Sequence, residues 1–191
     1  LAVAAHDRNG FAHFNYSQGV GAYNNDGTLK AGAKVFYVTK QTAKTISTNV
    51  AGVGTCTGLQ AIIDGYQKGQ DKTPIAFRII GTIQTANMDA LSSSSEGLQI
   101  KGKAADSELN ITIEGVGNDA TIKGFGFLIR NSASVELRNF GVMTGLDDGI
   151  SLDTDNDHIW VHHIDVFYGP HGSGDHAKGD GTVDLKGDSR Y

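Results

Sequence analysis

Short alternations of apolar and polar residues recur along the second half of the chain. Three of them lie 24 residues apart, at positions 111–114 (ITIE), 135–138 (VELR) and 159–162 (IWVH). A second series interleaves with the first, at positions 128–130 (LIR), 151–153 (SLD) and 184–186 (DLK). Period-two alternation is typical of strands with one buried face, and two interleaved series indicate coils stacked so that equivalent strands pair in parallel. The pattern predicts an all-β parallel solenoid.

The second series contains one longer step. Its anchors Ile129, Leu152 and Leu185 lie 23 and then 33 residues apart, which indicates an insertion of about ten residues within the polar stretch 168–181 (YGPHGSGDHAKGDG). Insertions into solenoids gather on one face and often build the binding site. An antiparallel sandwich of short strands is the alternative fold, and the regular period disfavours it.

The first half of the chain predicts fewer regular elements. Glycine and asparagine enrich the first 35 residues, which indicates an ordered wrap over a core. Residues 34–39 and 75–83 are predicted strands. Residues 57–69 carry apolar side chains at helical spacing and are the one predicted helix, a short one that ends at glycine. All 191 residues are expected to form a single domain.

Composition narrows the classes of function. The net charge of −5 argues against a nucleic-acid binder, and no apolar run reaches the roughly 18 residues of a membrane span. Binding of an anionic polymer by this acidic chain would require metal ions that invert the local field. The start of the sequence lacks the basic flank of a signal peptide, so we interpret it as a mature N-terminus or a cloning boundary. The lone Cys56 is expected to be a small buried residue and does not bear on secretion.

Acidic residues gather where two strands of the second series begin. Asp148 precedes one strand, Asp180 precedes the next, and Asp184 lies within it, alternating with the apolar Val183 and Leu185. In a parallel solenoid, residues one coil apart lie about 4.8 Å from each other, so these carboxylates are expected to be close. A hard cation relieves their repulsion, and Ca²⁺ tolerates an irregular oxygen cage. We therefore predict a Ca²⁺ site at Asp148, Asp180 and Asp184.

Other chemistries have weaker support. Asp153, Asp155 and Asp157 lie in a predicted turn, without the glycine and distal glutamate of an EF-hand loop. His162 and His163 are adjacent, so on a strand they are expected to point to opposite faces. Zinc is disfavoured, although His171 and His176 could approach Asp175 in the inserted loop. A serine hydrolase is also disfavoured, because the sequence has no G-x-S-x-G elbow.

Four ordered motifs resemble the pectate lyases of polysaccharide lyase family 1. They are GVGNDATIKGFGFLIRNSASVELRNFGV, DDGISLD, IWVHHIDVF and VDLKG, which follow the order of the family patterns IxGxGxxaxIxGxGfxI, DxIxID, vWIDHxxF and DIKG. The N-terminal GFAHFNYSQG is more loosely similar to the family's opening. The resemblance implies a right-handed, single-stranded parallel β-helix, secretion, and calcium-dependent eliminative cleavage of polygalacturonate (pectate) that gives 4,5-unsaturated oligogalacturonates.

The resemblance also implies roles for particular residues. The family's calcium-binding acids correspond to Asp148, Asp180 and Asp184, and the lysine that contacts a substrate carboxylate corresponds to Lys186. His163 matches a histidine that is structural in the family, and His162 stands where the family usually has aspartate. The family's catalytic arginine lies in a coil beyond VDLKG, and this sequence ends at Tyr191. We therefore expect either a fragment or a homo-oligomer that pairs through the open C-terminal edge of the solenoid.

Two other functions remain open on the sequence alone. A pectin lyase would act on methyl-esterified substrate without calcium, and the retained acids disfavour it. A non-catalytic β-helix would bind acidic glycans without cleaving them. The sequence does not distinguish endo from exo action, nor does it indicate a preferred degree of methylation.

Overall fold

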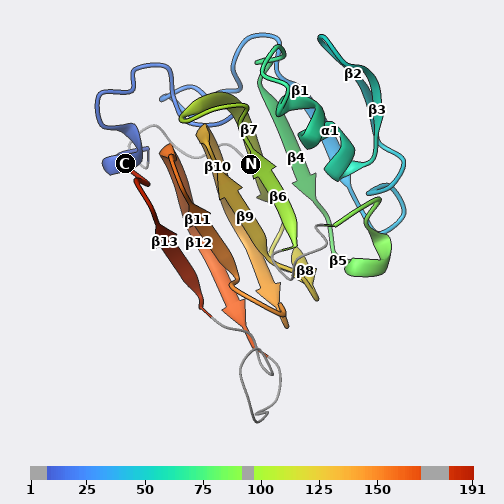
Figure 1. Ribbon diagram of the computed structural model, residues 1–191. Coiled ribbons are helices and arrows are strands. Elements are labelled where there is room, and N and C mark those ends of the chain that lie inside the picture. The colour runs from blue at the N-terminus through green and yellow to red at the C-terminus, as the bar shows by residue number, and fades with distance from the viewer. Residues whose placement is uncertain (1–7, 92–96, 169–180) are drawn as a thin grey trace.

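Two parallel sheets form the body of the computed structural model, which describes residues 8–91, 97–168 and 181–191 (Figure 1). The first sheet contains β1 (Lys34–Val38), β4 (Ile75–Ile79), β7 (Ser107–Gly115), β10 (Ser132–Met143) and β12 (Asp157–Phe167), with β8 (Thr121–Lys123) and β5 (Thr82–Gln84) joined to the second half of β10. The second sheet contains β6 (Leu98–Lys101), β9 (Phe127–Arg130), β11 (Ile150–Asp153) and β13 (Val183–Lys186).

The remaining elements lie mainly at one end of this body. The helix α1 (Leu59–Tyr66) and the antiparallel hairpin of β2 (Ser47–Val50) and β3 (Gly54–Thr57) lie at the end formed by β1 and β6, opposite β13 (Figure 1). Two short 3₁₀ turns, η2 (Phe11–His13) and η3 (Thr85–Asn87), complete the described elements. In the part of the chain that the structure describes, no helix has the length and apolarity needed to cross a membrane.

Strand register confirms the predicted stacking. Ile111 pairs with Val135, and Val135 pairs with Ile159, so the 24-residue repeat is the step from one coil to the next. In the second sheet, Ser151 pairs with Leu128 on one side and Asp184 on the other. The predicted all-β parallel β-helix with one short helix is therefore confirmed.

The apolar rows of successive coils form one continuous core. Ile111 and Val135 are fully buried, and Ile159 is 7% exposed. Cys56 is a free, buried cysteine within this core, as predicted. Each coil buries its apolar face only against its neighbours, so stacking supplies the core that no single coil could form.

Two element boundaries differ from the prediction. The predicted strand 75–83 is two strands, β4 and β5, because the chain turns a corner between them at Gly81, whose φ is +67°. The predicted helix 57–69 is shorter, since α1 begins at Leu59 and Thr57 belongs to β3. Apolar spacing did not reveal either boundary.

Asn139 in β10 and His163 in β12 lie at equivalent positions where the backbone of each long strand bends. Asn139 has φ of 58°, in the left-handed region that asparagine tolerates, and its side chain donates to the carbonyl oxygen of Gly115 at 2.8 Å. His163 occupies the same position one coil later and has φ of 51°. This corner interrupts the strand alternation, so the expectation that His162 and His163 point to opposite faces is wrong: their Nδ1 atoms lie 2.8 Å apart.

The glycine-rich N-terminal segment covers the outer face of the first sheet, as predicted for a wrap. In its described part, the amide of Gly21 donates to Ser134 Oγ at 2.9 Å and the amide of Ala22 donates to Thr112 Oγ1 at 2.9 Å. A Cβ at Gly21 would lie 2.3 Å from Thr112 Oγ1, so this close approach requires glycine.

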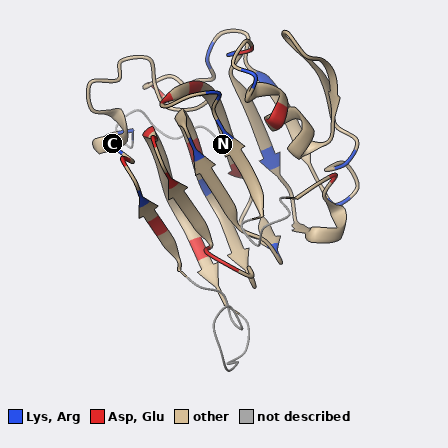
Figure 2. Cartoon of the chain, viewed as in Figure 1, with Lys and Arg blue, Asp and Glu red and all other residues tan. Residues whose placement is uncertain are grey.

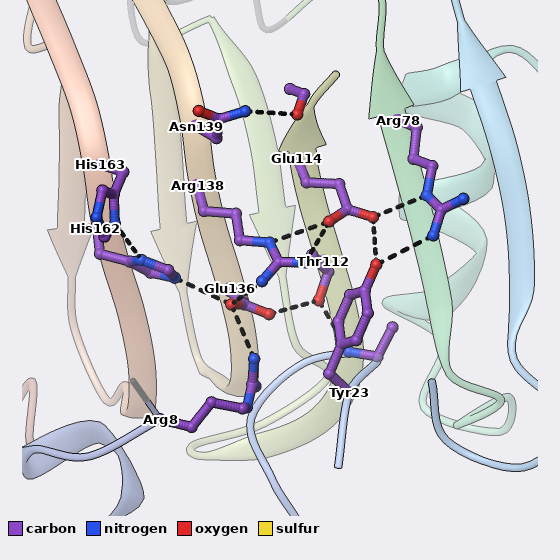
Figure 3. Close-up of polar contacts among 12 residues, drawn as sticks. Arg8, Tyr23, Arg78, Thr112, Glu114, Glu136, Arg138, Asn139, His162 and His163 are labelled. Atoms are coloured by element: carbon purple, nitrogen blue, oxygen red, sulfur yellow. Dashed lines mark hydrogen bonds and ion pairs between the residues drawn. The ribbon is translucent and has the colours of Figure 1, made fainter. Parts of the chain in front are cut away.

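A ladder of charges lies beneath this segment (Figure 3). Arg78, Glu114, Arg138 and His162 occupy equivalent positions on β4, β7, β10 and β12. The Nε atoms of Arg78 and Arg138 donate to the two carboxylate oxygens of Glu114, at 2.9 and 3.0 Å. The hydroxyl of Tyr23, from the N-terminal segment, also donates to Glu114. Charge therefore alternates along the stack from Arg78 through Glu114 to Arg138.

Glu136 is the fully buried centre of the same network. Its carboxylate accepts from Arg8 Nη1 at 3.3 Å and from Thr112 Oγ1 at 3.1 Å, and it lies 3.0 Å from His162 Nε2. Arg138 Nη1 lies 3.5 Å from it. Burial would raise the pKa of Glu136, but His162, Arg138 and Arg8 together hold this pKa below its usual value. Glu136 thus joins the N-terminal segment to the sheet through a buried carboxylate.

Replacing Glu136 by Gln is expected to destabilise the protein by about 3 kcal/mol, since removing one partner leaves buried guanidinium charges uncompensated. The measurement is the free energy of unfolding in urea. Asp165→Asn, an exposed change on β12, is the matched control and should stay within about 0.5 kcal/mol of wild type. Equal effects of the two substitutions would show that the network does not stabilise the fold.

Stability is also expected to fall as pH falls. Burial, together with the neighbouring His163 and Arg138, lowers the pKa of His162 more than Glu136 raises it. Below the usual histidine pKa of about 6.5, the unfolded chain therefore takes up a proton that the folded chain resists. Glu136 contributes a second loss of stability at lower pH. Its pKa in the folded protein lies below the usual glutamate value of about 4.3, so its contribution to stability declines below about pH 4.3 and is lost as the pH falls through the folded pKa.

Thermal unfolding midpoints of wild type and His162→Gln, measured from pH 8 down to 4, test this account. The unfolding midpoint of the variant should not show the decline that begins at about pH 6.5 in wild type. Burial also lowers the pKa of His13, but His13 is present in both proteins and leaves a common residual slope. Identical profiles would contradict the role given to His162.

Candidate metal and substrate site

The predicted acidic residues meet at the edge where β11 and β13 begin. Ile150 pairs with Val183, and the amide of Gly149 donates to the carbonyl oxygen of Gly181 at 2.9 Å. This register places Asp148 beside Gly181, one residue after Asp180 in the chain. Asp184 follows on β13, next to Ser151. Figure 2 shows the acidic and basic residues of these strands on the second sheet.

Lys186 lies between the carboxylates of Asp148 and Asp184. Asp148 is 6% exposed, and its Oδ1 accepts from the amide of Gly181 at 2.8 Å. Its Oδ2 lies 3.5 Å from Lys186 Nζ, which is also 3.8 Å from Asp184 Oδ2. Burial lowers the pKa of Lys186, but Asp148, Asp184 and Asp153 together outweigh it and hold this pKa above its usual value. The lysine is therefore a protonated counter-ion to the pair.

Both carboxylates face the same small space above the backbone of Gly181. A Cβ built on Gly181 would lie 2.6 Å from Asp148 Oδ1 and 2.6 Å from Asp184 Oδ1. Carboxylate oxygens that converge on one space suit Ca²⁺, which binds six to eight oxygens in flexible geometry. The donor set therefore fits this ion. Within residues 8–91, 97–168 and 181–191, no group of three or more metal-ligating side chains is assembled, so the described part contributes two carboxylates.

The structure brings together three of the four predicted site residues, Asp148, Asp184 and Lys186. Asp180 lies outside the described residues, and its role as a ligand stays a prediction. Gly181 was missed by sequence reasoning. The signal that could have found it is the 33-residue offset of the second series, which aligns position 181 with Asp148.

Val183 and Leu185 lie on the core-facing side of β13, in register with the buried Ile150 and Leu152. They are nevertheless 40% and 68% exposed, because no described strand covers them. Asp184 alternates with them, so it lies on the outer face as predicted.

The other candidate residues serve different purposes. The turn at 153–157 is confirmed: Asp153 pairs with Arg130, and the buried Asn156 donates to the carbonyl oxygens of Ile129 and Asp153 at 3.0 and 3.1 Å. His171, His176 and Asp175, the residues considered for zinc, lie outside the described residues.

Comparison with models of known protein families finds no match. Among curated proteins, the chain is 26% identical to a pectate trisaccharide-lyase of Bacillus licheniformis over 133 residues, which are 68% of this chain and 36% of that protein. It is 36% identical to a probable pectate lyase A of Neosartorya fischeri over 81 residues, 40% of this chain and 24% of that protein. The chain thus spans about a third or less of these relatives.

Solved structures of pectate lyases share the fold. One from a Bacillus species, in complex with trigalacturonate, superposes with a TM-score of 0.60 at 21% identity over 93% of this chain and 48% of that one. A Bacillus subtilis pectate lyase variant superposes with a TM-score of 0.57 at 14% identity over 100% of this chain and 57% of that one. The chain is therefore a distant homologue of the pectate lyases, and its fold is their parallel β-helix.

Proposed function

We propose that this chain binds Ca²⁺ and polygalacturonate and takes part in the calcium-dependent eliminative cleavage of (1→4)-α-D-galacturonan to 4,5-unsaturated oligogalacturonates. The observation that carries the proposal is the convergence of Asp148 and Asp184 on the space above Gly181, with Lys186 beside them. Distant homology to pectate lyases supports the same substrate class. Because the substrate is a cell-wall polymer, we further propose that the protein acts outside the cell.

Asp148 and Asp184 would hold the metal ion, with Asp180 as a third ligand. The amide of Gly181 fixes the carboxylate of Asp148 through its hydrogen bond of 2.8 Å, so this ligand is oriented before the ion arrives. The side chain of Lys186 is 53% exposed, and it can swing away from the two aspartates. Its raised pKa keeps it protonated, so it can then donate to the carboxylate of a galacturonate unit.

Elimination requires the proton at C5 of a galacturonate to become acidic. A bound Ca²⁺ would supply positive charge beside the uronate carboxylate, which stabilises the anion formed as that proton leaves. We assign no described residue as the base that takes the proton. Arg190 is engaged in an ion pair with Asp106, in the turn before β7. Assembly of copies through the edge of β13 stays a prediction.

Ultraviolet absorbance of the unsaturated product distinguishes the three candidate functions. We expect product from polygalacturonate in Ca²⁺, none after a chelator is added, and less from methyl-esterified pectin. Product that persists in chelator would favour a calcium-independent pectin lyase. If no substrate gives product but polygalacturonate still binds, the chain is a non-catalytic glycan binder.

Asp184→Asn is expected to weaken Ca²⁺ binding by at least about tenfold, since changes even outside the ligand shell cost that much. Isothermal titration calorimetry with Ca²⁺ alone measures this independently of turnover. The matched control is Asp188→Asn, an exposed aspartate in the turn after β13, which should bind Ca²⁺ as wild type does. Unchanged affinity in Asp184→Asn would reject this ligand.

Gly181→Ala should weaken Ca²⁺ binding about tenfold, or by about 1.4 kcal/mol, because its Cβ would occupy the space that both carboxylates face. Gly145→Ala is the matched control, since a Cβ there meets nothing closer than 3.6 Å. Calorimetry compares the two variants, and circular dichroism confirms that both are folded. Equal affinities would place the ion elsewhere.

A further inference from the structure

Two neighbouring histidines of β12 bring their rings together on the outer face of the first sheet (Figure 3). The Nδ1 atoms of His162 and His163 lie 2.8 Å apart, and the two ring planes are nearly perpendicular, at 78°. Successive side chains of a regular strand point to opposite faces, but His163 has φ of 51°, in the left-handed region. The bend turns its ring toward His162, so two ring nitrogens face each other on a different sheet from Asp148 and Asp184.

The ring of His162 is oriented by its neighbours. Its Nε2 lies 3.0 Å from a carboxylate oxygen of Glu136. An ionised carboxylate can only accept, so Nε2 carries the proton and Nδ1 of the neutral ring keeps a lone pair. The indole of Trp160 stacks on the same ring, with centroids 3.6 Å apart and planes 17° from parallel. A carboxylate that binds the far nitrogen of a histidine fixes the ring and makes the near nitrogen a stronger metal ligand.

The separation of the two nitrogens selects a kind of metal ion. Two nitrogens about 2.0 Å from an ion and 2.8 Å from each other subtend about 90° at that ion. This is the angle between neighbouring ligands in the square-planar or tetragonal geometry of Cu²⁺, which imidazole suits. A tetrahedral ion such as Zn²⁺ would need the two nitrogens about 3.3 Å apart. His163 is exposed, so its ring can turn to direct Nδ1 at the ion.

We propose that the Nδ1 atoms of His162 and His163 form a two-nitrogen binding site for Cu²⁺, separate from the carboxylates proposed to bind Ca²⁺. A proton shared between the two nitrogens accounts for their distance as a hydrogen bond, and the ion takes the place of that proton, which is released. Within residues 8–91, 97–168 and 181–191, no third metal-ligating side chain joins such a group, so water fills the remaining positions around the ion. The inference does not depend on the proposed function.

The chain also contains a reporter for this site. Trp160 is the single tryptophan of the sequence, and its indole lies against the ring of His162. Cu²⁺ is paramagnetic and quenches an indole that lies close to it. Fluorescence of Trp160 therefore reports an ion at this pair more strongly than an ion at a distant histidine.

Titration of the full chain with Cu²⁺, followed by the fluorescence of Trp160, tests the proposal. We expect saturable quenching in wild type, and His163→Asn should weaken Cu²⁺ binding by at least about tenfold, since changes even outside the ligand shell cost that much. Asparagine is the substitute because Asn139 occupies the equivalent bend with φ of 58°, and circular dichroism confirms that the variant is folded. Electron paramagnetic resonance of the wild type loaded with Cu²⁺ should show coupling to two nitrogens.

A matched histidine and two other ions serve as controls. His13 also packs against Trp160, with ring centroids 4.7 Å apart, and His13→Asn should bind Cu²⁺ as tightly as wild type does. Excess Ca²⁺, which prefers oxygen ligands, should not displace Cu²⁺, and Zn²⁺ should bind more weakly. Unchanged affinity in His163→Asn, an equal loss in His13→Asn, displacement by Ca²⁺, or Zn²⁺ that binds as tightly as Cu²⁺ would each overturn the inference.

Discussion

In-register stacking is the constraint on which the rest of this structure depends. Each coil places its residues directly beside the equivalent residues of the next coil, as Ile111, Val135 and Ile159 show in the core. Apolar rows of like residues stabilise one another in this arrangement. Charged rows of like sign would repel, so the outer face of the first sheet alternates Arg78, Glu114 and Arg138. The N-terminal segment then closes over this ladder and completes the pairing of Glu136 through Arg8.

The same constraint assembles the candidate site from positions far apart in the chain. Asp148 and Asp184 meet because β11 and β13 pair in register, and Gly181 leaves room between them. Two carboxylates held this close need a positive charge. Lys186 provides it in this structure, and in our proposal Ca²⁺ takes its place while the lysine turns to the substrate. Lys186 thus contacts the aspartate pair in this structure and, in our proposal, a bound uronate.

Much of this arrangement could be predicted from the sequence, because residues one repeat apart in the chain lie side by side on neighbouring strands. The 24-residue period identified β7, β10 and β12 of the first sheet and their register, and the second series brought Asp148, Asp184 and Lys186 together. Features that depend on backbone conformation could not be found in the same way. Alternation does not show that His163 adopts a left-handed conformation, nor that Gly81 divides a predicted strand.

The pattern of apolar and polar residues also did not predict side-chain contacts between segments that lie far apart in the chain. Arg8 and Glu136 are 128 residues apart, and no periodicity links the glycine-rich start of the chain to β10. The sequence placed Asp153 at the end of a strand and the start of a turn, but it did not show the ion pair with Arg130, 23 residues earlier. Composition predicted that the N-terminal segment wraps the core, but it did not reveal the buried ion pair between Arg8 and Glu136 that holds the segment there.

A crystal structure of the protein grown with Ca²⁺ and trigalacturonate tests the central claim most directly. The account predicts a calcium ion above Gly181, bound by Asp148 and Asp184, with Lys186 moved from the aspartates to a galacturonate carboxylate. A calcium ion bound elsewhere, or Lys186 still bridging the two aspartates with substrate present, would contradict it.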